Sequence, residues 1–141
     1  MAEELQEQLE QVHALLEQGY HCSQVMMGLS MELRQITAPF VLRALGALGY
    51  GMFAQRTCGI LTGGVCMLSS YFPREEVEPE PMGYQKLAER LVCWFEETYH
   101  SIQCGDLVGQ AQNCARCPQM MAETFVQCLA LLEEEGIDPY E

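Results

Sequence analysis

The sequence predicts an all-α protein, a single-domain bundle of about six helices. Apolar residues recur at spacings of three and four along most of the chain, which is the period of an amphipathic helix. No segment of useful length alternates apolar and polar residues as a half-buried strand would, and no internal repeat is present. With 141 residues and 49% apolar composition, the chain can bury one core, so residues 1–141 are predicted to form one domain.

Two amphipathic helices are predicted at the start of the chain. The first covers residues 3–18, carries glutamate and glutamine on its polar faces, and ends at Gly19, a residue type that favours helix C-termini. The second begins at Cys22, directly after that break. The two apolar stripes consist of Leu5, Leu9, Val12, Leu15 and Leu16, and of Val25, Met26, Leu29 and Leu33.

The middle of the chain is predicted to hold two further helices. One covers residues 38–48, with Pro39 in the first turn, where proline is tolerated. Three glycines between positions 46 and 51 then interrupt the pattern. The next helix covers residues 60–71 and is rich in small residues, so it is expected to be buried.

The C-terminal half alternates polar connections with helices. Residues 72–82 contain three prolines and four glutamates and are predicted to be an acidic linker within the domain. A fifth helix is predicted over residues 83–100, followed by an irregular stretch over residues 104–117. The last helix covers residues 118–134 and ends before Gly136.

Charge and hydropathy exclude several classes of partner. Twenty acidic residues against seven basic ones give a net charge of −13, which disfavours binding to nucleic acid or to an anionic membrane surface. No apolar run approaches the roughly 18 residues that a membrane span requires. The acidic N-terminus lacks the basic start and apolar stretch of a secretory signal, which favours a cytoplasmic location.

The eight cysteines are the most informative part of the composition. Thiols in the cytoplasm are kept reduced. Eight cysteines therefore indicate metal binding or redox chemistry rather than a framework of structural disulfides. Cys22 and Cys58 lie where helices are predicted to start, and Cys117 precedes Pro118, which predicts Cys117 as the N-cap of the last helix. Helix N-termini favour the thiolate over the thiol, so the pKa values of Cys22, Cys58 and Cys117 are expected to be lowered towards about 7. Cys104, in a glycine-rich turn, is the fourth candidate for a shared site.

The other cysteines carry weaker signals. Cys66 and Cys128 fall on apolar helix faces and are predicted to fill the core, and Cys93 is given the same inert role or a contact between helices. Cys114 forms a CxxC pair with Cys117, a spacing found in zinc ribbons, iron–sulfur proteins and dithiol enzymes. A c-type haem is excluded because proline follows this pair in place of histidine, and a thioredoxin-like motif because no strand precedes it.

The histidines offer further donors near two of these cysteines. His21 and His100 lie beside the helix boundaries near Cys22 and Cys104, where they could bind or tune a metal. Solvated boundary histidines are the simpler interpretation. His13 is expected on an exposed or half-exposed face of the first helix.

Taken with their local contexts, four cysteines resemble a known family. The chain is similar to the C-GCAxxG-C-C redox-active proteins, which carry an early cysteine, a CGAxxG motif and two further cysteines. The resemblance runs from about residue 15 to residue 132. The matching motifs are Cys22, Cys58-Gly59-Ile60-Leu61-Thr62-Gly63, Cys104-Gly105-Asp106-Leu107-Val108-Gly109 and Cys117-Pro118. The chain departs from the pattern at Ile60, which replaces the usual alanine, and at Cys114, an additional thiol.

The resemblance implies a redox site built on these motifs. A similar cysteine domain occurs in the split-Soret cytochromes, where it looks like an iron–sulfur-type site, and this favours a cluster here, without haem. The ligands are dispersed, so 2Fe–2S is expected over 4Fe–4S, which often uses a compact ferredoxin-like run. The implied site residues are Cys22, Cys58, Cys104 and Cys117 as metal ligands, with Gly59 and Gly63 at the cofactor.

The expected role is electron transfer or redox sensing with a partner protein. The chain lacks GxGxxG and GxxxxGK[ST], and nothing else indicates an enzyme with its own substrate. Two alternatives stay open: a metal-free thiol–disulfide oxidoreductase that uses Cys114 with Cys117, or Cys58 with another cysteine, and a structural zinc site in an interaction module. A homodimer is compatible with the sequence. The acidic first helix and residues 133–135 are interpreted as solvated surface, with docking of a basic partner as the alternative.

Overall fold

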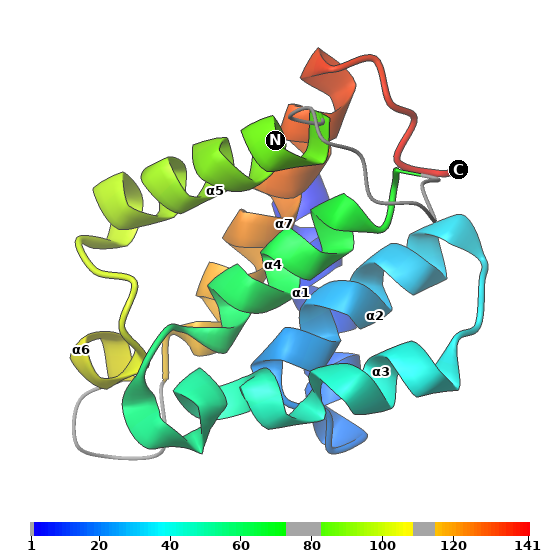
Figure 1. Cartoon of the computed structure of the whole chain (residues 1–141). Helices are drawn as coiled ribbons and strands as arrows, with labels where there is room; N and C mark the ends of the chain where they lie inside the picture. The colour runs from blue at the N-terminus through cyan, green and yellow to red at the C-terminus, as the bar shows by residue number, and fades with distance from the viewer. Residues whose placement is uncertain (1, 73–82, 109–114) are drawn as a thin grey trace.

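The computed structural model describes residues 2–72, 83–108 and 115–141. Within these ranges seven α-helices and two short helical turns pack as one body, and no strand forms beyond one isolated β-bridge (Figure 1). The prediction of an all-α bundle is confirmed. The helices are α1 (Ala2–Glu17), α2 (Cys22–Arg34), α3 (Pro39–Leu45), α4 (Gly59–Ser69), α5 (Gly83–Tyr99), α6 (Cys104–Val108) and α7 (Cys117–Glu134), and the turns are η1 (Gly46–Leu48) and η2 (Gly51–Gln55).

Helix α4 is the centre of the bundle. It packs against α2, α5 and α7, while α1 covers α7 and α2 from the other side (Figure 1). The core includes Phe95 from α5, Phe125 from α7 and Met26 from α2, each with no exposed surface. Burying an apolar side chain of this size contributes about 1.5–3 kcal/mol, so the apolar stripes of these helices supply most of the driving force.

Glycine allows α4 to approach α2 closely. A Cβ atom added at Gly63 would lie 2.6 Å from the carbonyl oxygen of Ser23 and 2.8 Å from the Ser23 Cα. Any side chain at this position would therefore collide with the backbone of α2. Two hydrogen bonds fix the start of α2 to the end of α3: Ser23 Oγ donates to the Leu45 carbonyl at 2.7 Å, and Gln24 Nε2 donates to the Leu42 carbonyl at 2.9 Å.

Most predicted helices are confirmed, with two corrections: one short helix was not predicted, and the last helix begins one residue earlier than predicted. Residues 104–117 were expected to be irregular, and this is wrong for Cys104–Val108, which form α6; five residues are too few to show a helical period. The N-cap of α7 is Arg116, and Cys117 and Pro118 are its first two residues. Proline is accepted there because the N–H groups of the first turn have no partner within the helix. Residues 73–82 of the predicted linker lie outside the described ranges.

The glycine-rich break before α4 is a left-handed turn. Positive φ angles occur at Tyr50 (51°), Met52 (60°), Phe53 (56°) and Gln55 (58°), as well as at Gly51 (59°). Each non-glycine residue in this conformation costs about 1 kcal/mol or more. The turn is held by a hydrogen bond from the Arg56 N–H to the Gly51 carbonyl at 3.0 Å, and by the Gln55 side chain, which donates to the Tyr50 hydroxyl at 3.1 Å. The sequence predicted an interruption here, not this conformation.

Across the described parts of the chain, no helix is both long enough and apolar enough to cross a membrane.

Candidate functional site

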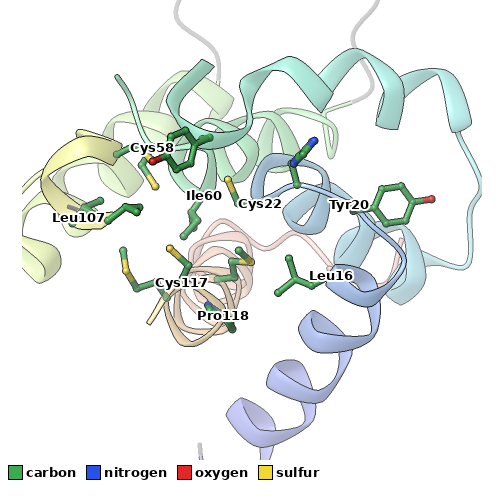
Figure 2. A pocket seen from close by; sticks show the side chains of 14 residues that line it. Leu16, Tyr20, Cys22, Cys58, Ile60, Leu107, Cys117 and Pro118 are labelled. Carbon is green, nitrogen blue, oxygen red and sulfur yellow. The ribbon is translucent and has the colours of Figure 1, made fainter. Parts of the chain in front are cut away.

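Four cysteines from separate segments line one cavity of about 320 Å³ (Figure 2). They are Cys22, Cys58, Cys104 and Cys117, the four that the sequence singled out. Each lies at the start of a helix, so the N-termini of α2, α4, α6 and α7 meet at this cavity. Helix N-termini carry unpaired N–H groups and a partial positive charge, which favour bound anions and thiolates.

Cys22 is positioned by the first turn of α2. His21 precedes the helix, and its N–H donates to the Gln24 side chain at 2.9 Å, which closes half of a capping box. Across the cavity wall, Gly59 leaves room for the thiol, because a Cβ atom there would lie 2.5 Å from Cys22 Sγ. Backbone hydrogen bonds from Tyr50 and Gly59 also reach this thiol.

A short antiparallel pairing sets Cys58 beside Cys104. The Cys58 N–H donates to the Ile102 carbonyl at 2.7 Å, and the Cys104 N–H donates to the Arg56 carbonyl at 2.6 Å. Between them lies the isolated β-bridge, which joins residues 57 and 103. Both side chains are buried, each with 4% of its surface exposed. This pairing brings together two cysteines that are far apart in the sequence.

Cys117 completes the group from the first turn of α7. It is disulfide-bonded in the structure, whereas Cys22, Cys58 and Cys104 are free thiols. In Figure 2 the labelled side chains of Cys22, Cys58 and Cys117 surround Ile60, which is 1% exposed. Ile60, the residue that departs from the motif that the chain resembles, therefore lies in the cavity wall.

Burial dominates the acidity of these thiols. It raises the pKa of Cys58 to about 12, with smaller contributions from the neighbouring Cys22 and Cys104 charges, while the N–H groups of Ile60 and Leu61 act in the opposite direction. Burial likewise raises the pKa of Cys22 and of Cys104. The prediction that helix N-termini would lower the pKa values is therefore wrong for Cys22 and Cys58, since the loss of hydration outweighs the effect of the helix N-termini.

The four cysteines supply the donor atoms of a metal centre, but they are not arranged as a complete ligand set. Among the described residues, no three histidine, cysteine, aspartate or glutamate side chains form a ready-made set of ligands for one ion. Four cysteines around one apolar cavity are nevertheless, once all are reduced, a donor set typical of iron–sulfur or zinc centres. A bound cation would also remove the repulsion between their thiolates. For all four cysteines to bind one centre, the disulfide at Cys117 must first be reduced.

The two glycines of the central motif have packing roles. Gly59 makes room for Cys22 Sγ, and Gly63 makes room for the backbone of α2. Their predicted contact with a cofactor stays a prediction.

The remaining cysteines divide by burial. Cys128 has no exposed surface and Cys66 is partly buried against the core, as predicted. Of the two roles predicted for Cys93, that of a buried core residue is wrong, because its side chain is exposed; it borders a shallow groove between α5 and α7, and a contact between helices stays a prediction. It follows the core residue Leu91 by two positions, and a step of that size turns a helical side chain away from the buried face. Cys114 lies outside the described residues.

The histidines and one tyrosine differ in their relation to the cavity. His21 lines it with an exposed ring that packs against Phe53, with ring centres 5.1 Å apart. His100 and His13 are exposed on the surface. Tyr50, which the sequence did not single out, contributes both its side chain to the wall and its backbone to Cys22. In the sequence, only the glycines around Tyr50 indicated that this segment departs from a regular helix.

Comparison with known proteins identifies the family of this chain. A family model described as "Putative redox-active protein (C_GCAxxG_C_C)" matches residues 20–131, which include all four cavity cysteines. The chain belongs to this family. The chain matches no curated protein and no solved structure.

Proposed function

We propose that this chain is a redox protein in which Cys22, Cys58, Cys104 and Cys117 bind an iron–sulfur cluster, 2Fe–2S rather than 4Fe–4S. Its role would be electron transfer or redox sensing in the reducing cytoplasm. The observation that supports this most is the shared cavity, because four cysteines spread from position 22 to position 117 line it from four helix starts. Membership of a family described as redox-active supports the same class of function.

The chain supplies three things that such a centre needs. Thiols provide soft ligands for iron, and a bound cluster would accept and release single electrons. Backbone N–H groups near Cys22 and Cys58 would hydrogen-bond to the sulfur atoms, which raises the reduction potential of a cluster. Apolar side chains such as Ile60 and Met121 limit the access of water to the cavity.

Anaerobic purification tests the proposal directly. The protein should be brown, absorb in the visible range, and contain iron and acid-labile sulfide in equal amounts. Two of each per chain would support 2Fe–2S, and Mössbauer or electron paramagnetic resonance spectra would identify the cluster type. A colourless protein loaded with zinc, or one without metal after reconstitution with iron and sulfide, would overturn the proposal.

Serine substitutions separate ligands from structural cysteines. Cys58→Ser should lose most of the iron while α4 still forms, since serine is a good N-cap residue. Cys66→Ser is the matched control, because Cys66 lies on the same helix but away from the cavity, and its iron content should equal that of the wild type. Equal iron in both variants would contradict the assignment of Cys58.

The CxxC pair requires its own comparison. Cys114→Ser should retain the cluster, and Cys117→Ser should lose most of it, with partial rescue by Cys114. If Cys114→Ser empties the site and Cys117→Ser does not, then the fourth ligand has been assigned to the wrong cysteine.

A second candidate is a metal-free thiol–disulfide oxidoreductase, which the disulfide at Cys117 favours. In that case the cavity would house a dithiol that a substrate disulfide oxidises, with two electrons and two protons passing from the dithiol to the substrate. A metal-free protein that reduces a glutathione disulfide substrate, and loses this activity in Cys117→Ser, would favour this candidate.

A further inference from the structure

Five large apolar side chains are exposed just before α3, in its first turn and in η2. The exposed fractions are 74% for Phe40, 57% for Phe53, 48% for Met52, 47% for Ile36 and 37% for Val41. Figure 1 shows α3, η1 and η2 following one another along one edge of the molecule. We call these five residues the apolar strip. Its two phenylalanines are exposed although each would gain stability by burial, which is characteristic of a surface that meets a partner.

The chain segment that carries the strip is basic, whereas the whole protein is acidic. Between Leu33 and Phe72 the sequence has three arginines and no acidic residue, whereas the whole chain has 20 acidic residues and seven basic ones. Arg43 lies over the Phe40 ring at 5.7 Å, and Arg56 directly follows η2. The short helix α6, which contacts η2, adds one acid, Asp106, and this carboxylate accepts a hydrogen bond from Ser101.

The strip is continuous with the cysteine cavity. Phe53 packs against the ring of His21, and both His21 and Tyr50 line the cavity. The left-handed backbone at Met52 and Phe53 is strained and yet directs apolar side chains into solvent. Strained backbone of this kind is found at functional sites more often than elsewhere. A partner bound to the strip would therefore sit at the wall of the cavity.

The size of the strip indicates a transient partner. Aromatic side chains present about 150–250 Å² when fully exposed, and the middle of that range applied to all five exposed fractions gives an upper figure of roughly 500 Å² for the strip. A stable dimer buries about 800 Å² per partner, whereas redox encounters fall below about 600 Å² per partner. A second copy of this chain would present the same two arginines, so it would not supply the carboxylates that complement Arg43 and Arg56.

We propose that the apolar strip, with Arg43 and Arg56, is the docking surface for a small acidic electron-carrier protein. Such a partner would present an apolar patch rimmed by carboxylates, which complements both the strip and the two arginines. This inference rests on the proposed redox function, because it is the adjoining cavity that gives an electron carrier a reason to bind there.

The test measures binding, so its result does not depend on whether the cysteines hold a cluster. The isotope-labelled full chain is titrated with two unlabelled probes, an acidic 2Fe–2S ferredoxin and an acidic flavodoxin, and followed by nuclear magnetic resonance. We expect at least one probe to shift signals within residues 36–56, with an affinity that falls as salt is added. If neither probe binds, or if the shifts lie elsewhere on the chain, the proposal is overturned.

Charge reversals supply the matched comparison. Arg43→Glu combined with Arg56→Glu should weaken binding about tenfold or more at low salt. The control is Lys86→Glu combined with Arg90→Glu, which changes the net charge equally on α5, where these residues pair with Glu135 and Glu134. The control should bind like the wild type, with circular dichroism showing that all variants are folded. Equal weakening in both would mean that net charge, not the strip, decides binding, and would overturn the proposal.

Two other occupants would give different results. If a second copy covers the strip, the wild type sediments as a dimer and Phe40→Ser combined with Phe53→Ser sediments as a monomer. If lipid covers it, the wild type binds phosphatidylglycerol vesicles and the same variant does not. Either result, without binding of the acidic probes, overturns the proposal, whereas a failure of the iron analysis leaves the binding result standing.

Discussion

Replacing Gly63 with alanine tests how the helices that carry the cavity are held together. The added Cβ atom would lie 2.6 Å from the Ser23 carbonyl oxygen and 2.8 Å from the Ser23 Cα, well inside the 3.4 Å at which ordinary contact begins. Both are backbone atoms of α2, so the clash can be relieved only if α2 and α4 move apart. That movement would loosen the contact at which Cys22 and Gly59 meet.

The energy of this change is the difference between two opposing effects. Alanine has a higher helix propensity than glycine by about 1 kcal/mol, which favours the variant. Overpacking a well-packed core costs about 1–3 kcal/mol and occasionally more, and a backbone clash belongs at the upper end of that range. We therefore expect the free energy of unfolding to fall by about 2 kcal/mol. With a urea dependence of about 2 kcal/mol per molar, the unfolding midpoint should fall by about 1 M.

The neighbouring glycine provides the control. A Cβ atom at Gly64 would meet only side-chain ends, the Leu91 Cδ2 at 3.0 Å and the Cys128 Sγ at 3.6 Å. Leu91 can shift slightly, so Gly64→Ala should change the free energy of unfolding by less than about 1 kcal/mol. Urea unfolding followed by circular dichroism compares the two variants. If Gly63→Ala is as stable as Gly64→Ala, then the close approach of α2 and α4 does not constrain the fold as argued.

Three further predictions concern individual side chains. Because Cys93 is exposed and Cys128 is fully buried, iodoacetamide should modify Cys93 at least about 100-fold faster than Cys128 in the native protein. Mass spectrometry of the digested protein measures the two rates, and equal rates would contradict the assigned burial. Cys128→Ala should lower the free energy of unfolding by about 1 kcal/mol or somewhat more, whereas Cys93→Ala should stay within about 0.5 kcal/mol of the wild type; equal losses by urea titration would refute the distinction. Burial and a hydrogen bond to Glu123 raise the pKa of Tyr99, so the folded state keeps this proton at a pH where the unfolded chain loses it. Stability from Tyr99 is therefore complete below about pH 10 and decreases above it, and the urea midpoint of Tyr99→Phe should fall less between pH 9 and pH 11 than that of the wild type.

Much of the helical framework follows from local patterns in the sequence. The stripe that includes Val12 and Leu15 predicts α1 and its buried face, and Gly19, with φ of 96°, ends it as expected. These features depend on residues a few positions apart, so the period of the apolar residues is enough to reveal them. The same local signals placed Cys22 and Cys58 at helix starts. The glycine-rich turn made Cys104 a candidate and the family resemblance supported it, but the helical period did not predict that Cys104 begins a helix.

The cavity itself depends on contacts between distant segments. Cys58 and Cys104 are neighbours because residues 56–58 pair with residues 102–104, and no local pattern encodes that pairing. The left-handed turn at Tyr50 is likewise maintained by its surroundings, since its residues individually disfavour positive φ. The sequence predicts cysteines at helix starts with lowered pKa values. In the packed structure Cys22 and Cys58 are shielded from water, and this burial raises their pKa values. Helix formation is local, whereas hydration and proximity are set by the whole packed chain, so only the tertiary structure decides what these cysteines share.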